Sequence, residues 1–240
     1  KNAALYEKTY GRAHTSPKLL SDAVYGLTEY ARDDLKNADL AACPGCYPTA
    51  SLLPLLPALP LIQSDNIIID AKSGVSGAGR KESTALLYPE TAEGAHAYGI
   101  GSHRHAPEID QALSKAADDK VSVSFTPHLL PMNRGMIATI YVTMNNGISV
   151  DDLRAAVSAR YEDEPFVHVE AKGTVPHTRH VRASNQCRIG VFEDRRPGQA
   201  ILVSVIDNLT KGSSGQAVQN LNVMMGWDET LGLTMPPVFP

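Results

Sequence analysis

Apolar residues fall into four runs whose pattern predicts β-strands. Residues 66–70 form a short apolar run that ends in a glycine-rich loop, which is typical of a buried strand. Residues 121–125 alternate strictly, as a half-buried strand does. Residues 136–144 and 200–206 are rich in β-branched side chains and long enough to belong to a sheet.

Helical periodicity appears between these runs. Pro107 suits a first helical position, and Ser149 suits the N-cap of a second helix whose first turn is acidic. Residues 215–225 repeat apolar side chains at the spacing of a buried stripe. The apolar positions are Ile109, Leu113 and Ala116 in the first helix, Leu153, Ala156 and Val157 in the second, and Val218, Leu221 and Met225 in the third. Helices interleaved with strands predict a mixed α/β chain.

Composition narrows the function classes. The 240 residues are 43% hydrophobic and 20% charged, with a formal net charge of −4, which gives no global attraction to nucleic acid or to an anionic membrane. The longest apolar run, residues 52–62, is broken by prolines, so no bilayer-spanning segment is expected. Three cysteines argue against a disulfide framework, and a reducing cytoplasm is the default location.

The first forty-odd residues lack the glycine-rich turn that opens a dinucleotide-binding half. Either this chain does not bind a dinucleotide, or the binding half lies outside it.

The segment from Ala42 to Ala50 carries the most informative chemistry. Pro44 and Gly45 predict a turn, and Cys46 then opens a helix-like run. A thiol at a helix N-terminus lies at the positive end of the helix dipole, so we expect a lowered pKa and a reactive thiolate. The free N–H groups of that first turn could also hold an oxyanion.

Other interpretations of the cysteines stay open at this point. Cys43 and Cys46 form a C-x-x-C pair, which could be a redox pair or half of a zinc site. Zinc would need two more ligands, and Cys187 has no matching partner. Cys43 and Cys46 could also be inert buried cysteines.

The segment PGCYPTA resembles the active-site segment of the N-acetyl-gamma-glutamyl-phosphate reductases of arginine biosynthesis. Further blocks resemble the same family in the same order: YGRAHTSPKLLSDAVYGLTE before the cysteine, then SGVSGAGRK, HRHAPEID, FTPHLLPMNRGM and DNLTKGSSGQAVQNLNVMMGW. We therefore expect a family member that lacks most of the N-terminal nucleotide-binding half.

The resemblance implies an α/β fold. Residues 1–45 would end a Rossmann-type NADP-binding domain, and residues 46–206 would form an α+β catalytic and oligomerisation domain with an open mixed or antiparallel sheet. Residues 207–240 would form a C-terminal helix and tail that pack on the nucleotide domain. The implied cofactor is NADP(H), and the implied assembly is a homodimer or homotetramer.

The implied chemistry begins with attack of the Cys46 thiolate on an acyl phosphate. Phosphate leaves, and hydride from the nicotinamide reduces the resulting thioester to the semialdehyde. His103 is the expected acid/base, with Glu108 orienting its imidazole. His105 is the rival, and a surface-loop histidine is the bland alternative.

The resemblance also suggests contacts with cofactor and substrate. Cofactor contacts are expected at Ser76, Gly77, Gly79, Asn208 and Lys211. Phosphate or the substrate carboxylate is expected at Arg80, Arg104 and Arg134, because a guanidinium binds either group through two hydrogen bonds. Tyr98 corresponds to a family tyrosine near the site and is expected beside the substrate. Solvated arginines, a core tyrosine and a loop-capping asparagine are the alternatives. No metal is expected.

Two further functions remain open. A sister reductase of lysine biosynthesis, acting on a carrier-linked aminoadipyl phosphate, has similar motifs. A non-catalytic assembly module would also fit a chain without the glycine-rich loop. HRHAPEI and DNLTKGSSGQAVQ argue against aspartate-semialdehyde and glyceraldehyde-phosphate dehydrogenases.

Overall fold

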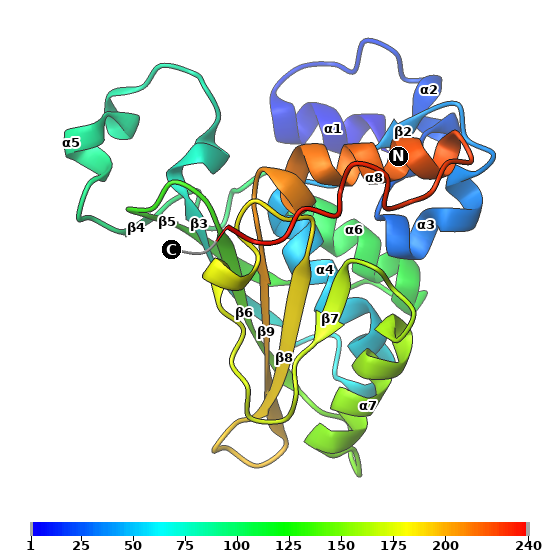
Figure 1. The fold of residues 1–240 in the computed structure, drawn as a ribbon, viewed down its shortest axis with the longest axis vertical. Helices are drawn as coiled ribbons and strands as arrows, with labels where there is room; N and C mark the ends of the chain where they lie inside the picture. Colours follow the sequence, from blue (N-terminus) through cyan, green and yellow to red (C-terminus); the bar gives the residue numbers. More distant parts are fainter. Residues whose placement is uncertain (1, 239–240) are drawn as a thin grey trace.

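A seven-stranded mixed sheet organises the chain (Figure 1), and the computed structural model describes residues 2–238. The strand order is β4-β5-β3-β6-β9-β8-β7, with parallel pairing between β3 and β5 and between β7 and β8, and antiparallel pairing elsewhere. The strands are β3 (Ile68–Gly74), β4 (His96–Ala97), β5 (Ser124–Leu130), β6 (Met136–Thr143), β7 (Val167–Val169), β8 (Cys187–Glu193) and β9 (Gln199–Ile206). The predicted α/β class is confirmed.

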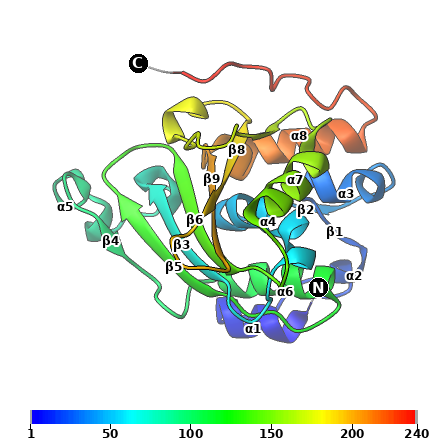
Figure 2. The same ribbon diagram turned by 90° about the horizontal axis from the view of Figure 1, so that it is seen from below.

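Three helices cover one face of the sheet (Figures 1 and 2). They are α4 (Cys46–Ala58), α6 (Ala106–Ala117) and α7 (Val150–Tyr161). The sheet side chains beneath them form a continuous apolar row, because Ile69, Ile140, Leu202 and Val191 are in register on neighbouring strands and all are buried. Helix α4 is apolar on all sides and almost wholly buried, as a helix in the middle of a core should be.

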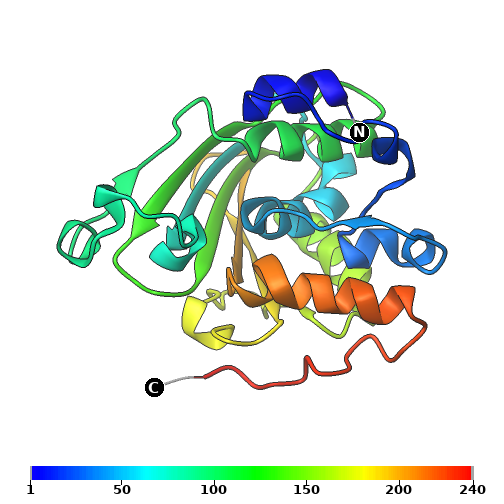
Figure 3. The ribbon, with the colours of Figure 1, turned by 90° about the horizontal axis from the view of Figure 1, so that it is seen from above.

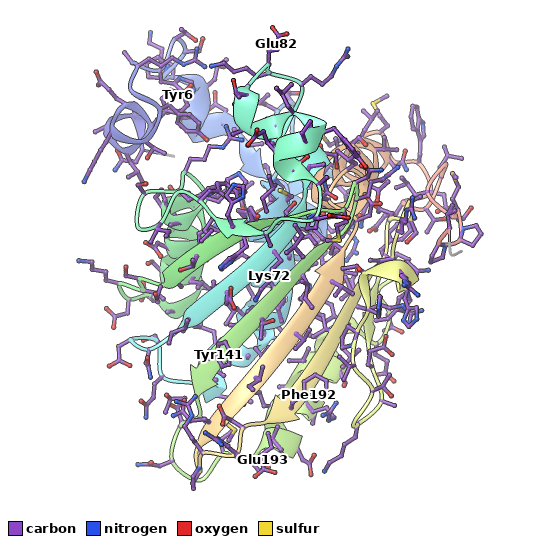
Figure 4. The ribbon with its side chains drawn as sticks, turned by 90° about the vertical axis from the view of Figure 1, so that its left-hand side faces the viewer. Tyr6, Lys72, Glu82, Tyr141, Phe192 and Glu193 are labelled. Carbon is purple, nitrogen blue, oxygen red and sulfur yellow. The ribbon has the colours of Figure 1, made fainter. Side chains whose placement is uncertain are left out.

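The opposite face of the sheet is open (Figure 4). Successive strand residues point to opposite faces, so the positions next to the buried row point outward. Ile68, Tyr141, Ile201 and Phe192 are in register across β3, β6, β9 and β8, and Ile68 is 45% exposed. This face therefore carries an apolar row, which we call the open-face row.

The remaining elements gather at one end of the sheet (Figures 1 and 3). From the N-terminal part come α1 (Ala3–Tyr10), α2 (Leu19–Asp22), β1 (Val24–Tyr25), α3 (Thr28–Leu35) and β2 (Ala41–Ala42), and β1 pairs with β2 in a separate parallel sheet. From the C-terminal part come a π-helical turn, Thr210–Ser214, and α8 (Gly215–Met224), which packs on α3. A short helix, α5 (Tyr88–Thr91), lies on a protruding segment.

The strand predictions hold at β6 and β9, while β3 and β5 begin later than expected. Residues 121–123 lie outside β5 because α6 side chains take their backbone N–H groups. Ser114 Oγ accepts from Val121 N at 2.9 Å, and Asp110 Oδ1 accepts from Val123 N at 2.9 Å. The ladder with β3 therefore starts only at Ser124.

Helices α6 and α7 form as predicted, and Ser149 makes a capping box with Asp152. The predicted stripe of α8 is wrong. Its apolar side chains Val218, Leu221 and Met225 are exposed by 38%, 47% and 54%. The buried face is mainly polar, because it meets polar groups of α3 and carries Gln216, Gln219, Asn220 and Asn222.

Candidate active site

Cys46 is the first residue of α4, and its first turn lies between α6 and α8 (Figure 3). The preceding residue, Gly45, has extended backbone and offers no side-chain cap, so the N–H groups of this turn are left for other partners. Cys46 is half-buried. The predicted helix start at Cys46 is confirmed.

The expected low pKa of Cys46 is wrong for this structure. Burial raises the pKa of the Cys46 thiol to about 11, and the negative charge of Glu108 acts in the same direction. The N–H groups of Tyr47 and Cys46 and the positive charge of Arg104 lower the pKa but do not outweigh burial. The resting group at neutral pH is therefore a thiol, and reaction requires a proton acceptor.

Glu108 supports the cysteine turn rather than His103. Its Oε1 accepts a hydrogen bond from Gly45 N at 3.0 Å and another from the Tyr25 hydroxyl at 2.8 Å. Burial raises the pKa of Glu108, and the Gly45 and Tyr25 bonds partly offset this. The hydrogen bonds of Glu108 thus run to the residue before the nucleophile, which corrects its expected role as the orienting partner of His103.

Both histidines of the HRH block lie beside this turn. The His105 ring packs on Gly45 so closely that a Cβ added to Gly45 would lie 2.5 Å from His105 Nε2. His105 Nδ1 is buried without a hydrogen-bond partner among the described residues. His103 Nδ1 accepts from His105 N at 3.1 Å, and its ring lies edge-on to those of Tyr47 and Tyr98.

Burial keeps both imidazoles neutral. It lowers the pKa of His103 to about 4 and that of His105 to about 3, and Arg104 adds to both effects. Neutral imidazoles can accept a proton from a thiol. The geometry therefore places two candidate bases next to a protonated Cys46 thiol.

Tyr98 lies on the sheet side of these rings. Its hydroxyl donates to the Tyr47 hydroxyl at 3.0 Å, which in turn donates to the His128 carbonyl at 3.3 Å. Burial raises the pKa of Tyr98, and the interacting groups include Cys46 and Arg104. Tyr98 is thus near the cysteine as predicted from the sequence, and its role stays a prediction.

The glycine-rich loop after β3 is joined to the segment after β9 by Asn208. The Asn208 Nδ2 donates to Ser76 Oγ at 2.9 Å, and its Oδ1 accepts from Gly135 N at 2.8 Å. Gly79 has φ +81, and no atom lies within 4 Å of the position that a Cβ would take there. A Cβ at Gly77 would meet Ser73 Oγ at 2.8 Å. At Gly79 the loop thus leaves its backbone open, near the hydrogen-bonded Ser76 hydroxyl and Asn208 amide.

Two of the predicted cationic contacts are used inside the protein. Lys211 is fully buried, and its Nζ donates to Glu29 Oε1 at 2.6 Å and to Gln219 Oε1 at 2.7 Å. This contradicts a direct contact of the Lys211 ammonium with a cofactor. Arg134 Nε lies 2.9 Å from Oδ2 of the buried Asp207, so its charge is compensated.

The other two arginines are exposed. Arg104 lines a shallow groove of ≈ 150 Å³ between α1 and α6, together with Glu108, Tyr6 and Tyr10. It also interacts electrostatically with Cys46. Arg80 lies on the segment after the glycine-rich loop, where its role stays a prediction. Of the four predicted anion-binding side chains, Arg104 has the placement most suited to an anion near Cys46.

Tyr25, Glu29 and Gly212 were not predicted from the sequence. A Cβ added to Gly212 would lie 2.9 Å from Cys46 Cβ, so this glycine packs directly against the Cys46 side chain. In the sequence, Glu29 is only a glutamate within an amphipathic helix, and Lys211 is only a lysine between a strand and a helix. Such residues are normally solvated, so pattern alone does not identify them.

The described residues contain no cluster of three or more His, Cys, Asp or Glu side chains arranged to hold a metal ion. Cys43, Cys46 and Cys187 are all free thiols. Between residues 2 and 238, every helix is too short or too polar to cross a bilayer.

Comparison with known proteins adds independent evidence. Residues 46–208 match the family model described as semialdehyde dehydrogenase, dimerisation domain. A probable N-acetyl-gamma-glutamyl-phosphate reductase, chloroplastic, of Arabidopsis thaliana is 57% identical over all of this chain, which spans 60% of that relative's length. An N-acetyl-gamma-glutamyl-phosphate reductase of Afipia carboxidovorans is 56% identical over 97% of the chain, and the match covers 67% of that relative.

The fold also occurs in solved structures. Aspartate semialdehyde dehydrogenase II from Vibrio cholerae superposes with a TM-score of 0.68 at 17% identity, covering 86% of this chain and 69% of that one. An aspartate semialdehyde dehydrogenase of Francisella tularensis gives a TM-score of 0.68 at 13% identity, covering 85% of this chain and 71% of that one. At these identities the likeness shows the fold alone.

The raised pKa predicts how Cys46 reacts with iodoacetamide. Because only the thiolate is alkylated, the rate should rise about tenfold per pH unit from pH 7 and still be rising at pH 10. Replacing Glu108 by Gln removes a negative charge beside the thiolate, so the pKa should fall and alkylation at pH 8 should be faster. Peptide mass spectrometry at a series of pH values measures both effects.

Asp110→Asn is the matched control, since Asp110 lies on the same helix but bonds Val123 N instead of Gly45 N. A rate that levels off between pH 6 and 8, or equal rates in the Gln and Asn variants, would contradict this account.

Proposed function

Since this chain belongs to the N-acetyl-gamma-glutamyl-phosphate reductase family, we propose that it carries the catalytic part of such an enzyme. The reaction would be the NADPH-dependent reduction of N-acetyl-gamma-glutamyl phosphate to N-acetylglutamate 5-semialdehyde and phosphate, in arginine biosynthesis. The observation that supports it best is Cys46 at the open start of a buried helix, beside two neutral histidines. The three free thiols of the chain suit a reducing compartment, and we propose that the protein lies in the cytoplasm.

The first chemical step belongs to Cys46. Its sulfur attacks the acyl carbon, the carbon–oxygen bond to phosphate breaks, and a thioester remains on the sulfur. The carbonyl oxygen becomes negatively charged during the attack, and the free N–H groups of the first turn of α4 stabilise that charge. Since the thiol starts protonated, its proton must go to a neighbouring base.

We assign this proton to His105. Its Nε2 edge packs on Gly45, directly before the nucleophile, and its Nδ1 has no other partner among the described residues. His103 instead accepts the backbone N–H of His105 and so fixes the position of that ring. This assignment reverses the order of preference that follows from the sequence.

The residues around the glycine-rich loop fit the nicotinamide end of NADP(H). Ser76, after β3, and Asn208, after β9, bring a hydroxyl and an amide together, and the open backbone at Gly79 allows close approach of a ligand. Gly77 is exposed and would contact the cofactor through its backbone, since the space of its missing side chain is filled by Ser73 Oγ. When bound, this cofactor supplies the hydride that reduces the thioester. Arg104 would bind an anionic group of the substrate, since it lies in the groove at the start of α6.

We further propose that the chain assembles as a homodimer, or as a homotetramer built from such dimers, through the open-face row. An apolar row across four strands is costly to leave in water, and a twofold contact covers the same row on both subunits. The polar pair of Asp70 and Lys72 lies on the same face and could set the register of the contact.

The reaction is tested in the reverse direction, on the protein that includes its nucleotide-binding half. N-acetylglutamate semialdehyde should reduce NADP only when phosphate is present, and Cys46→Ser should lower the rate by roughly 10³-fold or more. Cys43→Ser, three residues away, is the matched control and should stay active.

A folded wild-type protein that binds NADPH but shows no activity would overturn the substrate assignment, and activity on the aminoadipate analogue would then identify the sister reductase. Absence of NADPH binding would instead point to an assembly module.

Variants of the two histidines should differ in kcat. His105→Asn should lower kcat by about 10²-fold to 10⁴-fold, the usual contribution of a general base, while His103→Asn should have a smaller effect because its role is indirect. Steady-state rates at saturating substrate measure the difference. The reverse order would assign the proton to His103.

The subunit contact is tested by charge. Ile68→Asp places a carboxylate in the open-face row and should convert the assembly to monomers, as measured by light scattering. Leu19→Asp is the matched control, because Leu19 is 50% exposed on α2, away from the sheet. If both variants keep the wild-type mass, the open face is not the interface.

A further inference from the structure

One short segment, Tyr25 to Glu29, reaches both sides of the nucleophile. It connects β1 to α3 and lies outside the segments assigned above to substrate and cofactor. On one side the Tyr25 hydroxyl donates to Glu108, and the same Glu108 oxygen accepts the N–H of Gly45. A chain of two hydrogen bonds therefore runs from Tyr25 to the residue before Cys46.

On the other side, Glu29 forms an ion pair with Lys211 in which both side chains are fully buried. Lys211 directly precedes Gly212, whose Cα lies against Cys46 Cβ. Gln219 joins the pair, because its Oε1 accepts from Lys211 and its Nε2 donates to Glu29 Oε1. The two ends of the segment thus control Gly45 and Gly212, which lie on either side of the nucleophile.

Stability alone does not account for this arrangement. A buried ion pair is often no more stabilising than apolar residues of similar size, because both charges lose their hydration. Glu29 Oε2 also lacks a hydrogen-bond partner among the described residues, which adds to the cost. What such a pair does provide is a fixed orientation of its two side chains. Here it anchors the π-helical turn that contains Lys211, and π-helical turns are frequent at functional sites.

The surrounding contacts restrict the segment to one position. Thr28 Oγ1 donates to Asn220 Oδ1 at 2.7 Å, and Asn220 Nδ2 donates to the Gly26 carbonyl at 2.8 Å. A Cβ at Gly26 would lie 2.4 Å from Asn220 Nδ2, so a larger residue there would displace the amide that makes both of these bonds. Thr28 and Gly26 are therefore both tied to α8 through the single side chain of Asn220.

We propose that Tyr25 and Glu29 are positioning residues, which hold Gly45 and Gly212 against Cys46 and so keep its sulfur aligned with the N–H groups of α4. This rests on the proposed function, in which Cys46 is the nucleophile. Small displacements of a reacting atom cost large factors in rate, so loss of either contact slows the chemical step without weakening substrate binding.

Tyr25→Phe removes one hydroxyl and tests the first contact. In the protein with its nucleotide-binding half, kcat should fall about tenfold while KM stays within about twofold. In the 240-residue chain, iodoacetamide should alkylate Cys46 several-fold faster, since the turn at Gly45 is less restrained. Cys187, which is fully buried in the sheet, reports general unfolding and should remain as protected as in the wild type.

Tyr30→Phe is the matched control. Its hydroxyl likewise forms a hydrogen bond with another tyrosine, accepting from Tyr161 at 3.3 Å, and its ring lies beneath Arg160. No contact joins Tyr30 to Glu108 or Gly45 among the described residues. If Tyr25→Phe matches this control in kcat and in Cys46 alkylation, the proposal is wrong. Because the alkylation ratio needs no substrate, it decides the positioning role even if the proposed reaction itself is not found.

The second contact is tested by the double variant Glu29→Gln with Lys211→Met. Single variants leave an unpaired buried group and are expected to unfold, whereas the double variant removes both charges and should keep Cys187 protected. Its kcat should fall at least as far as that of Tyr25→Phe. A folded double variant with wild-type kcat would remove Glu29 from the proposal.

Discussion

The packing around the first turn of α4 is the constraint on which the rest of the site depends. Cys46 lies between two glycines that leave no spare space, with His105 against Gly45 on one side and Gly212 against the Cys46 Cβ on the other. The partly buried Glu108 accepts the N–H of Gly45, and the buried Glu29 pairs with Lys211, the residue directly before Gly212. A side chain at either glycine would displace a group next to the nucleophile.

This close packing has an electrostatic consequence. The helix N-terminus favours a thiolate, but burial opposes it more strongly and raises the pKa of the thiol to about 11. The same burial lowers the pKa values of the two histidines, which keeps them neutral. Burial therefore produces a protonated nucleophile and unprotonated bases together, a combination suited to proton transfer during attack rather than before it.

The sequence predicted those features that depend on local periodicity and local capping. The helix that begins at Cys46, the N-cap at Ser149, and strands β6 and β9 follow from residue pattern alone. The partners of the charged side chains do not follow from residue pattern, because they come from distant segments of the chain. Lys211 was assigned to a cofactor since nothing near it in sequence indicates Glu29, which lies 182 residues away.

Helix α8 shows the same limit in another form. Its periodicity was correct, but pattern does not tell which face is buried when the neighbouring helix is polar. The Gln219 and Asn220 side chains face α3 because Glu29, Thr28 and the Gly26 carbonyl require hydrogen-bond partners there. The apolar stripe is therefore exposed by default.

Charge around Cys46 is reduced to a few groups because most of the nearby cations are neutralised. Lys211 is paired with Glu29, and Arg134 with Asp207. Arg104 and Glu108 remain, and they act on the thiol in opposite directions. An anion next to Arg104 would cancel its positive charge, and the pKa values of the Cys46 thiol and of both histidines would then rise together. One exposed arginine therefore sets the proton affinities of the thiol and of both imidazoles at the same time.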